Sequence, residues 1–195
     1  MELWVATANS HKLEEIRHIL NNHTFEIHST AELEYYTSPL ETGKTFTENA
    51  RIKAKTLKAV KLNAWILADD SGLEVEGLNN MPGVHSARYA GEKARDSENT
   101  AKLLKMMSLR SATNRKAQFR CCLVLIDPNG HEQIFEGILL GEISRQQRGQ
   151  NGFGYDNIFI PQGGNKTLAE LTPAEKNKIS HRAQALRKLK EQLFK

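Results

Sequence analysis

The chain has 195 residues, of which 39% are hydrophobic and 26% are charged, and its formal net charge is +4. This length and composition predict one soluble globular domain, residues 1–195, with a full hydrophobic core. They exclude a membrane-spanning protein, because no apolar run approaches the roughly 20 residues that a transmembrane helix needs. The N-terminus also lacks the basic and apolar regions of a signal peptide, so we expect a cytoplasmic protein with no membrane partner.

The apolar spacing predicts alternating strands and helices in the first half of the chain. Thr45 and Glu48 fit a capping box at the start of a helix, because the hydroxyl of Thr45 and the carboxylate of Glu48 can satisfy each other's backbone N–H groups. The predicted elements are a strand at 3–6, a helix carrying Leu13, Ile16 and Leu20, a helix from Thr45 to about Leu62, a strand at 65–69 and an extended piece at 73–75.

The second half begins with a helix that Asp96 is expected to cap. Strands at 119–126 and 133–140 flank Asp127-Pro128-Asn129-Gly130, which is a strong hairpin signal. A short strand at 158–160 precedes one last helix, which Thr172, Pro173 and Glu175 begin and which continues to Leu193. No repeat or linker interrupts this order, so the chain is predicted to be a mixed α/β protein.

Two cysteines, Cys121 and Cys122, are adjacent in a predicted strand. Neighbouring strand residues point to opposite faces, so no disulfide is expected between them, and a reducing compartment is favoured. The mild positive charge is compatible with nucleic acid, with a small polyanion such as a nucleotide, or with surplus surface lysine.

Asp69-Asp70-Ser71-Gly72 is the segment that points most directly to chemistry. Two adjacent carboxylates repel each other unless a cation or a proton is close. Mg²⁺ takes carboxylate oxygens and commonly shares them with substrate phosphates, so this segment suits a metal and a phosphate. The alternative is an ordinary turn, since Asp, Ser and Gly are common turn residues.

Two segments carry groups suited to phosphates. Residues 7–12 lie between a strand and a helix, where free N–H groups and the helix dipole favour an anion. The alternative is an ordinary helix cap followed by a solvated Lys12. Asn49 and Lys53 share one helix face, and Lys53 either reaches a phosphate or extends to solvent.

Two later segments carry groups suited to a planar base. Phe153 and Tyr155 offer rings on which a base gains roughly 1–3 kcal/mol by stacking, or else they fill the core. Lys176, His181 and Arg182 can contact base oxygens and phosphates, unless His181 is an ordinary solvated helix residue. The polar loop at 82–91 is compatible with an ordinary surface loop.

Taken together and in this order, these segments closely resemble the ITP/XTP pyrophosphatase family. The matching stretches cover nearly the whole chain and are residues 7–12, 45–54, 68–73, 82–91, 152–156 and 179–183. The resemblance implies an elongated mixed β-sheet flanked by helices, with two lobes around a deep central groove. It also implies a homodimer and a Mg²⁺-dependent hydrolysis of ITP, dITP and XTP to the monophosphate and pyrophosphate.

The resemblance also implies roles for individual residues. Asp70 corresponds to the general base and a metal ligand, Glu41 is the candidate second metal ligand, and Lys12 and Lys53 provide charge at the phosphates. The implied substrate contacts are Thr7, Ala8, Asn9, Ser10, His11 and Lys12 at the phosphates, then Ser71, then Phe153, Gly154, Tyr155 and Asp156 beside the base, and finally Lys176, His181 and Arg182. Asp69 is expected to orient or tune Asp70.

Three positions depart from the family pattern. Ala8 replaces a common glycine, Asn157 replaces a usual proline, and Leu40 replaces an acidic residue before Glu41. A Maf-like pyrophosphatase acting on pyrimidine or modified nucleotides is the nearest alternative. A nucleic-acid-binding module without catalysis is the other, but the sequence has no RRM-like or helix-turn-helix signature and only 7% aromatic residues, so no nucleic-acid partner is expected.

Overall fold

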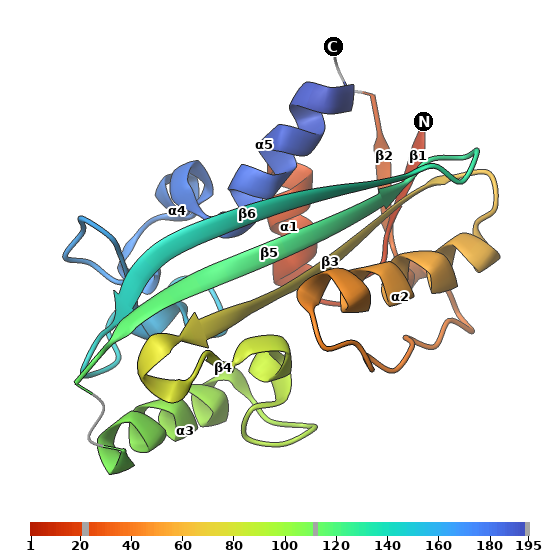
Figure 1. The fold of residues 1–195 in the computed structure, drawn as a ribbon. Coiled ribbons are helices and arrows are strands. Elements are labelled where there is room, and N and C mark those ends of the chain that lie inside the picture. Colours follow the sequence, from red (N-terminus) through yellow and green to blue (C-terminus); the bar gives the residue numbers. More distant parts are fainter. Residues whose placement is uncertain (21–23, 111–112, 194–195) are drawn as a thin grey trace. The chain divides into compact units, whose positions relative to one another are not determined.

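The computed structural model describes residues 1–20, 24–110 and 113–193 (Figure 1). The strands are β1 Glu2–Val5, β2 Glu26–Ser29, β3 Trp65–Val75, β4 Met81–Pro82, β5 Lys116–Ile126, β6 Glu132–Ile143 and β7 Phe159–Pro161. The helices are α1 Ser10–Ile19, α2 Phe46–Val60, α3 Asp96–Leu109, α4 Pro173–Ile179 and α5 His181–Leu193. None of the helices in these described ranges is long and apolar enough to cross a membrane.

All seven strands belong to one mixed sheet with the order β2-β1-β3-β5-β6-β7, and β4 pairs with β3 outside this path. β1 is parallel to both of its neighbours, with Leu3 opposite Ile27 in β2 and Trp65 in β3. The β3–β4 and β6–β7 pairs are antiparallel. The predicted mixed α/β fold, with a sheet flanked by helices, is therefore confirmed.

The chain divides into two compact units, each assembled from separate segments. The first unit contains Met1–Asp70, Cys121–Gly137 and Arg182–Lys195, and the second contains Ser71–Arg120 and Ile138–His181. The long strands β3, β5 and β6 each contribute residues to both units.

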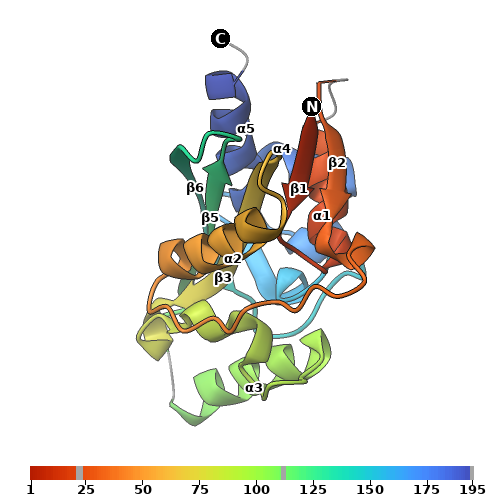
Figure 2. The same ribbon diagram turned by 90° about the vertical axis from the view of Figure 1, so that its right-hand side faces the viewer.

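The first unit has helices on both faces of its strands. Figures 1 and 2 show α2 on one side of the strands and α1 with α5 on the other. On the second of these sides, Ile16 and Leu20 from the α1 region and Leu186 and Leu189 from α5 pack against Leu67 of β3 within one buried cluster. Apolar residues at helical spacing produce this arrangement, because they place one stripe of each helix against the sheet.

The second unit has its own core. Leu73 and Val75 of β3, Leu103 and Met107 of α3, and Phe159 of β7 belong to one buried cluster. Figure 1 shows α3 near the C-terminal end of β3. This packing fixes α3, whose first turn contacts residues of the candidate site described below.

The locally encoded features agree with the sequence. Thr45 with Glu48 and Thr172 with Glu175 form the predicted capping boxes, and Pro173 is the first residue of its helix. In the predicted hairpin turn, the N–H of Gly130 donates to the carbonyl of Asp127 at 3.1 Å. Cys121 and Cys122 are both buried and unbonded to each other, as expected.

Two predicted elements were wrong in their extent. The strand expected to end at Asp69 continues as β3 through Asp69-Asp70-Ser71-Gly72 to Val75, so this segment is not a turn. The single C-terminal helix is two helices, because Ser180 adopts φ −59° and ψ 152°, which is extended and not helical. In addition, Arg95 and not Asp96 is the N-cap residue of α3.

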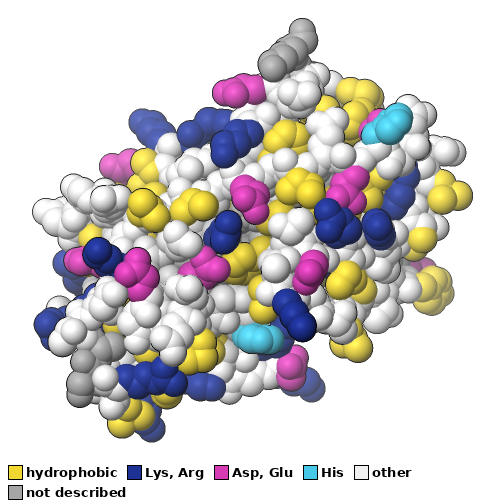
Figure 3. All heavy atoms as spheres, viewed as in Figure 1, with side chains coloured by type: hydrophobic (Ala, Val, Ile, Leu, Met, Phe, Trp, Pro, Cys, Tyr) yellow, Lys and Arg dark blue, Asp and Glu magenta, His cyan; other side chains and the backbone are white. Residues whose placement is uncertain are grey.

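Exposed charges of both signs are intermixed on the face drawn in Figure 3, where Lys and Arg side chains lie among Asp and Glu side chains. A surface of this kind agrees with the modest net charge of +4.

Candidate active site

The pleat of β3 sends its two adjacent aspartates to opposite faces of the sheet. Successive strand residues alternate in direction, so Asp69 faces α1 and α5 while Asp70 faces α2. Each carboxylate meets a lysine from the helix on its own side: Lys12 of α1 contacts Asp69, and Lys53 of α2 contacts Asp70. The repulsion expected between two neighbouring carboxylates is thus relieved by two different cations.

Asp69 is the centre of a buried ionic network. Its side chain accepts from Lys12 Nζ at 2.6 Å and from Arg182 Nε at 2.7 Å, and the Cys121 thiol lies 3.4 Å from the same carboxylate. Arg182 also donates to Glu15 of α1. Burial alone would raise the pKa of Asp69, but the charges of Arg182 and Lys12 outweigh it and hold that pKa well below its usual range. Asp69 is therefore a fixed anion.

Asp70 has a different environment. Lys53 Nζ donates to Asp70 Oδ1 at 2.8 Å, to Glu41 Oε1 at 3.0 Å and to the Asp69 carbonyl at 2.8 Å. The other oxygen, Asp70 Oδ2, is buried and has no hydrogen-bond partner within residues 1–20, 24–110 and 113–193. Burial raises the pKa of Asp70, although Lys53 and Lys12 act against this shift. A carboxylate with a raised pKa and one unpartnered oxygen is suited to accept a proton or to bind a cation.

The carboxylates beside Lys53 are compatible with a divalent metal that is shared with a substrate. No group of three or more His, Cys, Asp or Glu side chains in the described parts of the chain is placed to hold a metal alone. Mg²⁺ is commonly bound through only one or two carboxylates together with substrate phosphates. The unpartnered Asp70 Oδ2 fits such a ligand, and Glu41 reaches the same lysine, whereas Leu40 is 84% exposed.

The predicted phosphate loop lies at the start of α1. Asn9 is its N-cap and accepts from the Lys12 N–H at 3.0 Å, while the Thr7 hydroxyl accepts from the Asn9 N–H at 3.1 Å. Ala8, Ser10 and His11 are exposed. Cap formation and anion binding are compatible here, because the Asn9 cap engages the Lys12 N–H, and the N–H groups of a helix's first turn have no partner inside the helix.

The glycine-rich loop in the second unit is organised by Asp156. This buried carboxylate accepts from the Phe153 N–H at 2.9 Å and from Lys176 Nζ at 2.6 Å. Lys176 Nζ also lies 4.5 Å from the centroid of the Phe153 ring, which is a cation–π contact. Gly152 has φ +74°, and a Cβ there would lie 2.1 Å from Asp156 Oδ2, so only glycine fits this position without rearrangement.

The remaining predicted residues of the second unit have structural partners as well. The buried Tyr155 hydroxyl donates to the Ser86 carbonyl at 2.8 Å. His181 stacks on Phe119 with ring centroids 4.7 Å apart and an interplanar angle of 7°. Ser71 lies in β3 and is partly buried. Asn157, where the family usually has proline, donates to Gln147 at 3.2 Å.

The structure thus collects the predicted residues into two groups. The first unit brings Lys12, Glu41, Lys53, Asp70 and Arg182 around β3, and the second brings Phe153, Gly154, Tyr155, Asp156 and Lys176 into one loop region. Sequence reasoning missed Glu15, Cys121 and Asp96, which contact these residues. Their partners are between 52 and 167 positions away in the chain, so no local pattern could identify them.

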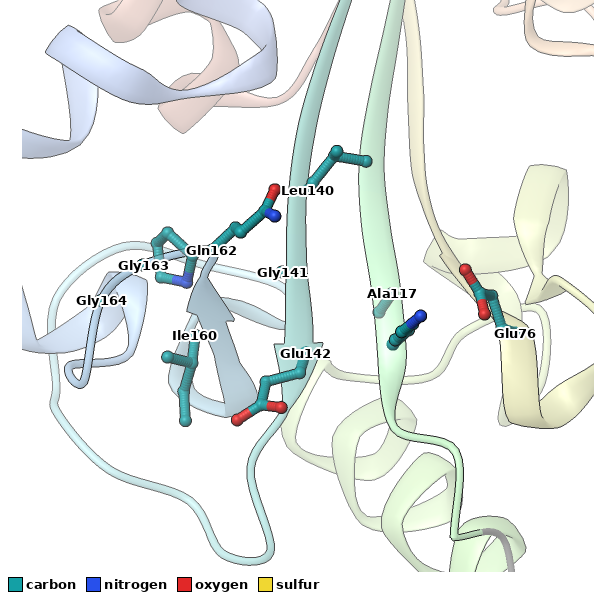
Figure 4. A pocket seen from close by; sticks show the side chains of 11 residues that line it. Glu76, Ala117, Leu140, Gly141, Glu142, Ile160, Gln162, Gly163 and Gly164 are labelled. Carbon is teal, nitrogen blue, oxygen red and sulfur yellow. The ribbon is translucent and has the colours of Figure 1, made fainter.

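A cavity of about 510 Å³ in the second unit is separate from these residues. It is lined by side chains that include Leu140 and Glu142 of β6 and Gln162 after β7 (Figure 4). None of the predicted site residues lines it.

Comparison with known proteins identifies the family. The Ham1 family model matches residues 3–192. The chain belongs to the Ham1 family. This Ham1 chain is 51% identical to the dITP/XTP pyrophosphatase of Bdellovibrio bacteriovorus, over 99% of the chain and 98% of that relative. It is 44% identical to the dITP/XTP pyrophosphatase of Bacillus subtilis, over 98% and 96% of the two chains.

Solved structures of the Ham1 family have the same fold. A HAM1 protein from Coxiella burnetii matches with a TM-score of 0.89 and 42% identity, over 99% of this chain and 98% of that one. A nucleoside-triphosphatase, dITP/XTP pyrophosphatase, from Mycobacterium abscessus matches with a TM-score of 0.78 and 44% identity, over 97% and 98%. The family resemblance predicted from the motifs is therefore confirmed.

Proposed function

We propose that this Ham1 chain hydrolyses the triphosphates of deaminated purines, namely dITP, ITP and XTP, to the monophosphate and pyrophosphate, and so removes them from the nucleotide pool. The observation that carries the proposal is its full-length similarity, at 44–51% identity, to relatives named dITP/XTP pyrophosphatase. These names favour deaminated purines over the pyrimidine or modified substrates of a Maf-like enzyme.

Asp70 is the proposed general base. Its carboxylate accepts a proton from the attacking water, and the raised pKa of the carboxyl makes that acceptance more favourable. The water oxygen bonds to the α-phosphorus, and the bond from that phosphorus to the oxygen bridging the α- and β-phosphates breaks. Pyrophosphate leaves with the electron pair, and the nucleoside monophosphate remains.

The two lysines are proposed to face the phosphates from the two sides of β3. Lys12 is held by the fixed anion Asp69, and Lys53 is held by Asp70 and Glu41. Lysines that are already positioned need little reorganisation when negative charge develops on the phosphates, and this preorganisation is a main source of catalysis in phosphoryl transfer. Thr7, Ala8, Asn9, Ser10 and His11 are the proposed further phosphate contacts.

Mg²⁺ is the proposed cofactor, with Asp70 as one ligand and Glu41 as the candidate second ligand. When bound, the ion would neutralise phosphate charge and lower the pKa of a coordinated water. The supporting observations are the unpartnered Asp70 Oδ2 and the approach of Glu41 to the same Lys53 ammonium.

The loop of the second unit is proposed to recognise the base, with Phe153, Gly154, Tyr155 and Asp156 beside it. Ser71 is a proposed further substrate contact, and Lys176, His181 and Arg182 are proposed contacts of the base and phosphates. A deaminated purine carries an oxygen at C6, which accepts hydrogen bonds, where adenine carries an amine that donates them. Donors placed for that oxygen would lose their partner with adenine, and buried unpaired donors discriminate strongly.

From the family resemblance we also propose a single functional domain, a homodimer and a cytoplasmic location.

The test is pyrophosphate release from ITP, dITP, XTP, dUTP, GTP and ATP, each with and without Mg²⁺. We expect release from the first three with Mg²⁺ and little from the others. Release from dUTP alone would support the Maf-like alternative, and release from none would refute the enzyme. Asp70→Asn should keep the fold and lose most turnover. The control Asp127→Asn, in the β5–β6 turn, should keep normal turnover. Near-normal turnover by Asp70→Asn would contradict the role of Asp70.

A further inference from the structure

The first two turns of α3 hold the backbone of Gly154 from two sides. Asp96 Oδ2 accepts from the Gly154 N–H at 2.6 Å, and the Thr100 hydroxyl donates to the Gly154 carbonyl at 3.3 Å. Asp96 and Thr100 are four positions apart, so they lie on the same face of the helix. The hydrogen bond that Asp96 accepts is charge-assisted, which makes it the stronger of the two.

These contacts add to a turn that spans Gly154, in which the Asp156 N–H donates to the Phe153 carbonyl at 3.2 Å. Gly154 has φ +63°, and a Cβ at this position would have no atom within 4 Å, so no side-chain packing holds this position. Glycine populates many backbone conformations when nothing holds it, and ordering such a residue has an entropic cost. The bonds to Asp96 and Thr100 therefore select one conformation in advance.

The position of Phe153 depends on this selection. Its own N–H donates to Asp156, and the following N–H, that of Gly154, donates to Asp96. Two carboxylates therefore hold the peptide groups on the two sides of the Phe153 Cα. With both peptide planes fixed, the backbone of Phe153 is fixed, and so is the direction in which its ring leaves the chain.

The helix that supplies Asp96 is itself firmly anchored. Asn99 is buried, accepts from the Ala90 N–H at 2.7 Å and donates to the Ala87 carbonyl at 3.1 Å. Leu103 and Met107 of the same helix lie in the core of the second unit. A rigid helix can transmit its position to a loop, whereas a loosely packed helix cannot.

We propose that Asp96 is a positioning residue for purine recognition: it holds the Phe153–Gly154 peptide so that the loop is preorganised to bind the base. This inference rests on the proposed function and adds a residue to it. Asp96 itself need not touch the nucleotide. Losing it would return conformational freedom to the loop in the free protein, and substrate binding would then have to order the loop again.

The test compares three variants in steady-state kinetics with dITP. Asp96→Ala should raise KM about 10-fold and leave kcat within about twofold, because uniform binding is lost and not transition-state stabilisation. Asp96→Asn keeps an oxygen that accepts from Gly154 and should restore most of the affinity. Glu98→Ala is the matched control: Glu98 is in the same helical turn and accepts from the Arg95 N–H at 2.7 Å. It should therefore weaken the helix start without raising KM.

Amide hydrogen exchange across residues 152–156 provides a readout independent of turnover. Asp96→Ala should exchange faster there than the wild type and than Glu98→Ala. An unchanged exchange rate, or an equal KM increase in Glu98→Ala, would overturn the positioning role. If the wild type turns over dITP and Asp96→Ala has a normal KM, only the role of Asp96 fails. If the wild type releases no pyrophosphate from any triphosphate, the proposed function fails, and the recognition role fails with it.

Discussion

Replacing Arg182 by methionine is expected to destabilise the first unit severely. Arg182 is 1% exposed, and its Nε donates to Asp69 Oδ2 at 2.7 Å while its Nη1 donates to Glu15. Methionine has a similar length but no charge, so Asp69 would remain buried with one cation fewer. Removing one partner of a buried ion pair typically costs about 3–5 kcal/mol, because the remaining charge has been taken out of water without compensation. For a chain of this size, this corresponds to a fall in Tm of roughly 6–20 °C.

Urea unfolding followed by circular dichroism would measure the free energy of unfolding for the wild type and Arg182→Met. Lys188→Met is the matched control on the same helix, since Lys188 makes an exposed contact with the Glu136 carbonyl. We expect the free energy of unfolding of the control to fall by less than about 1 kcal/mol.

A double variant tests the electrostatic reasoning directly. With Arg182→Met already present, adding Asp69→Asn removes the buried carboxylate that has lost one of its cations and should recover part of the lost stability, so the two effects should not be additive. A loss below about 1 kcal/mol for Arg182→Met alone, or additive losses in the double variant, would refute the reasoning.

Two further predictions concern groups outside this network. Lys58 donates to the carbonyls of Leu62, Ala64, Asp127 and Pro128. Lys58→Met should therefore lower the free energy of unfolding, measured by thermal unfolding, by about 1–3 kcal/mol. A decrease within about 0.5 kcal/mol would contradict this role. Burial raises the pKa of Tyr155 above its ordinary value. The contribution of the neutral Tyr155 hydroxyl to the free energy of unfolding is therefore complete below about pH 10. Above about pH 10 this contribution falls by about 1.4 kcal/mol per pH unit. Tyr155→Phe should therefore lose stability less steeply than the wild type between pH 10 and 11 in urea unfolding, and equal slopes would refute this.

The polar groups of the site were visible in the sequence, and the family resemblance assigned different roles to Asp69 and Asp70, but the residues alone show no physical cause for that difference. Asp69 and Asp70 are identical side chains at adjacent positions, and residue order alone treats them almost alike. The structure separates them through what lies on each face of β3: Arg182, which is 113 positions from Asp69, and Lys53, which is 17 positions from Asp70. The same limit applies to Asp96, whose contact with Gly154 spans 58 positions.

The sequence by itself determined the features whose causes lie within a few residues. The capping boxes at Thr45 and Thr172 and the turn at 127–130 are of this kind. The order of the motifs along the whole chain also indicated the family. Tertiary structure decided that β3 continues through its two aspartates and that the C-terminal helix breaks at Ser180. For β3, the physical reason is that a buried carboxylate is tolerable in a strand only where distant cations compensate it, and such partners meet only when the chain folds.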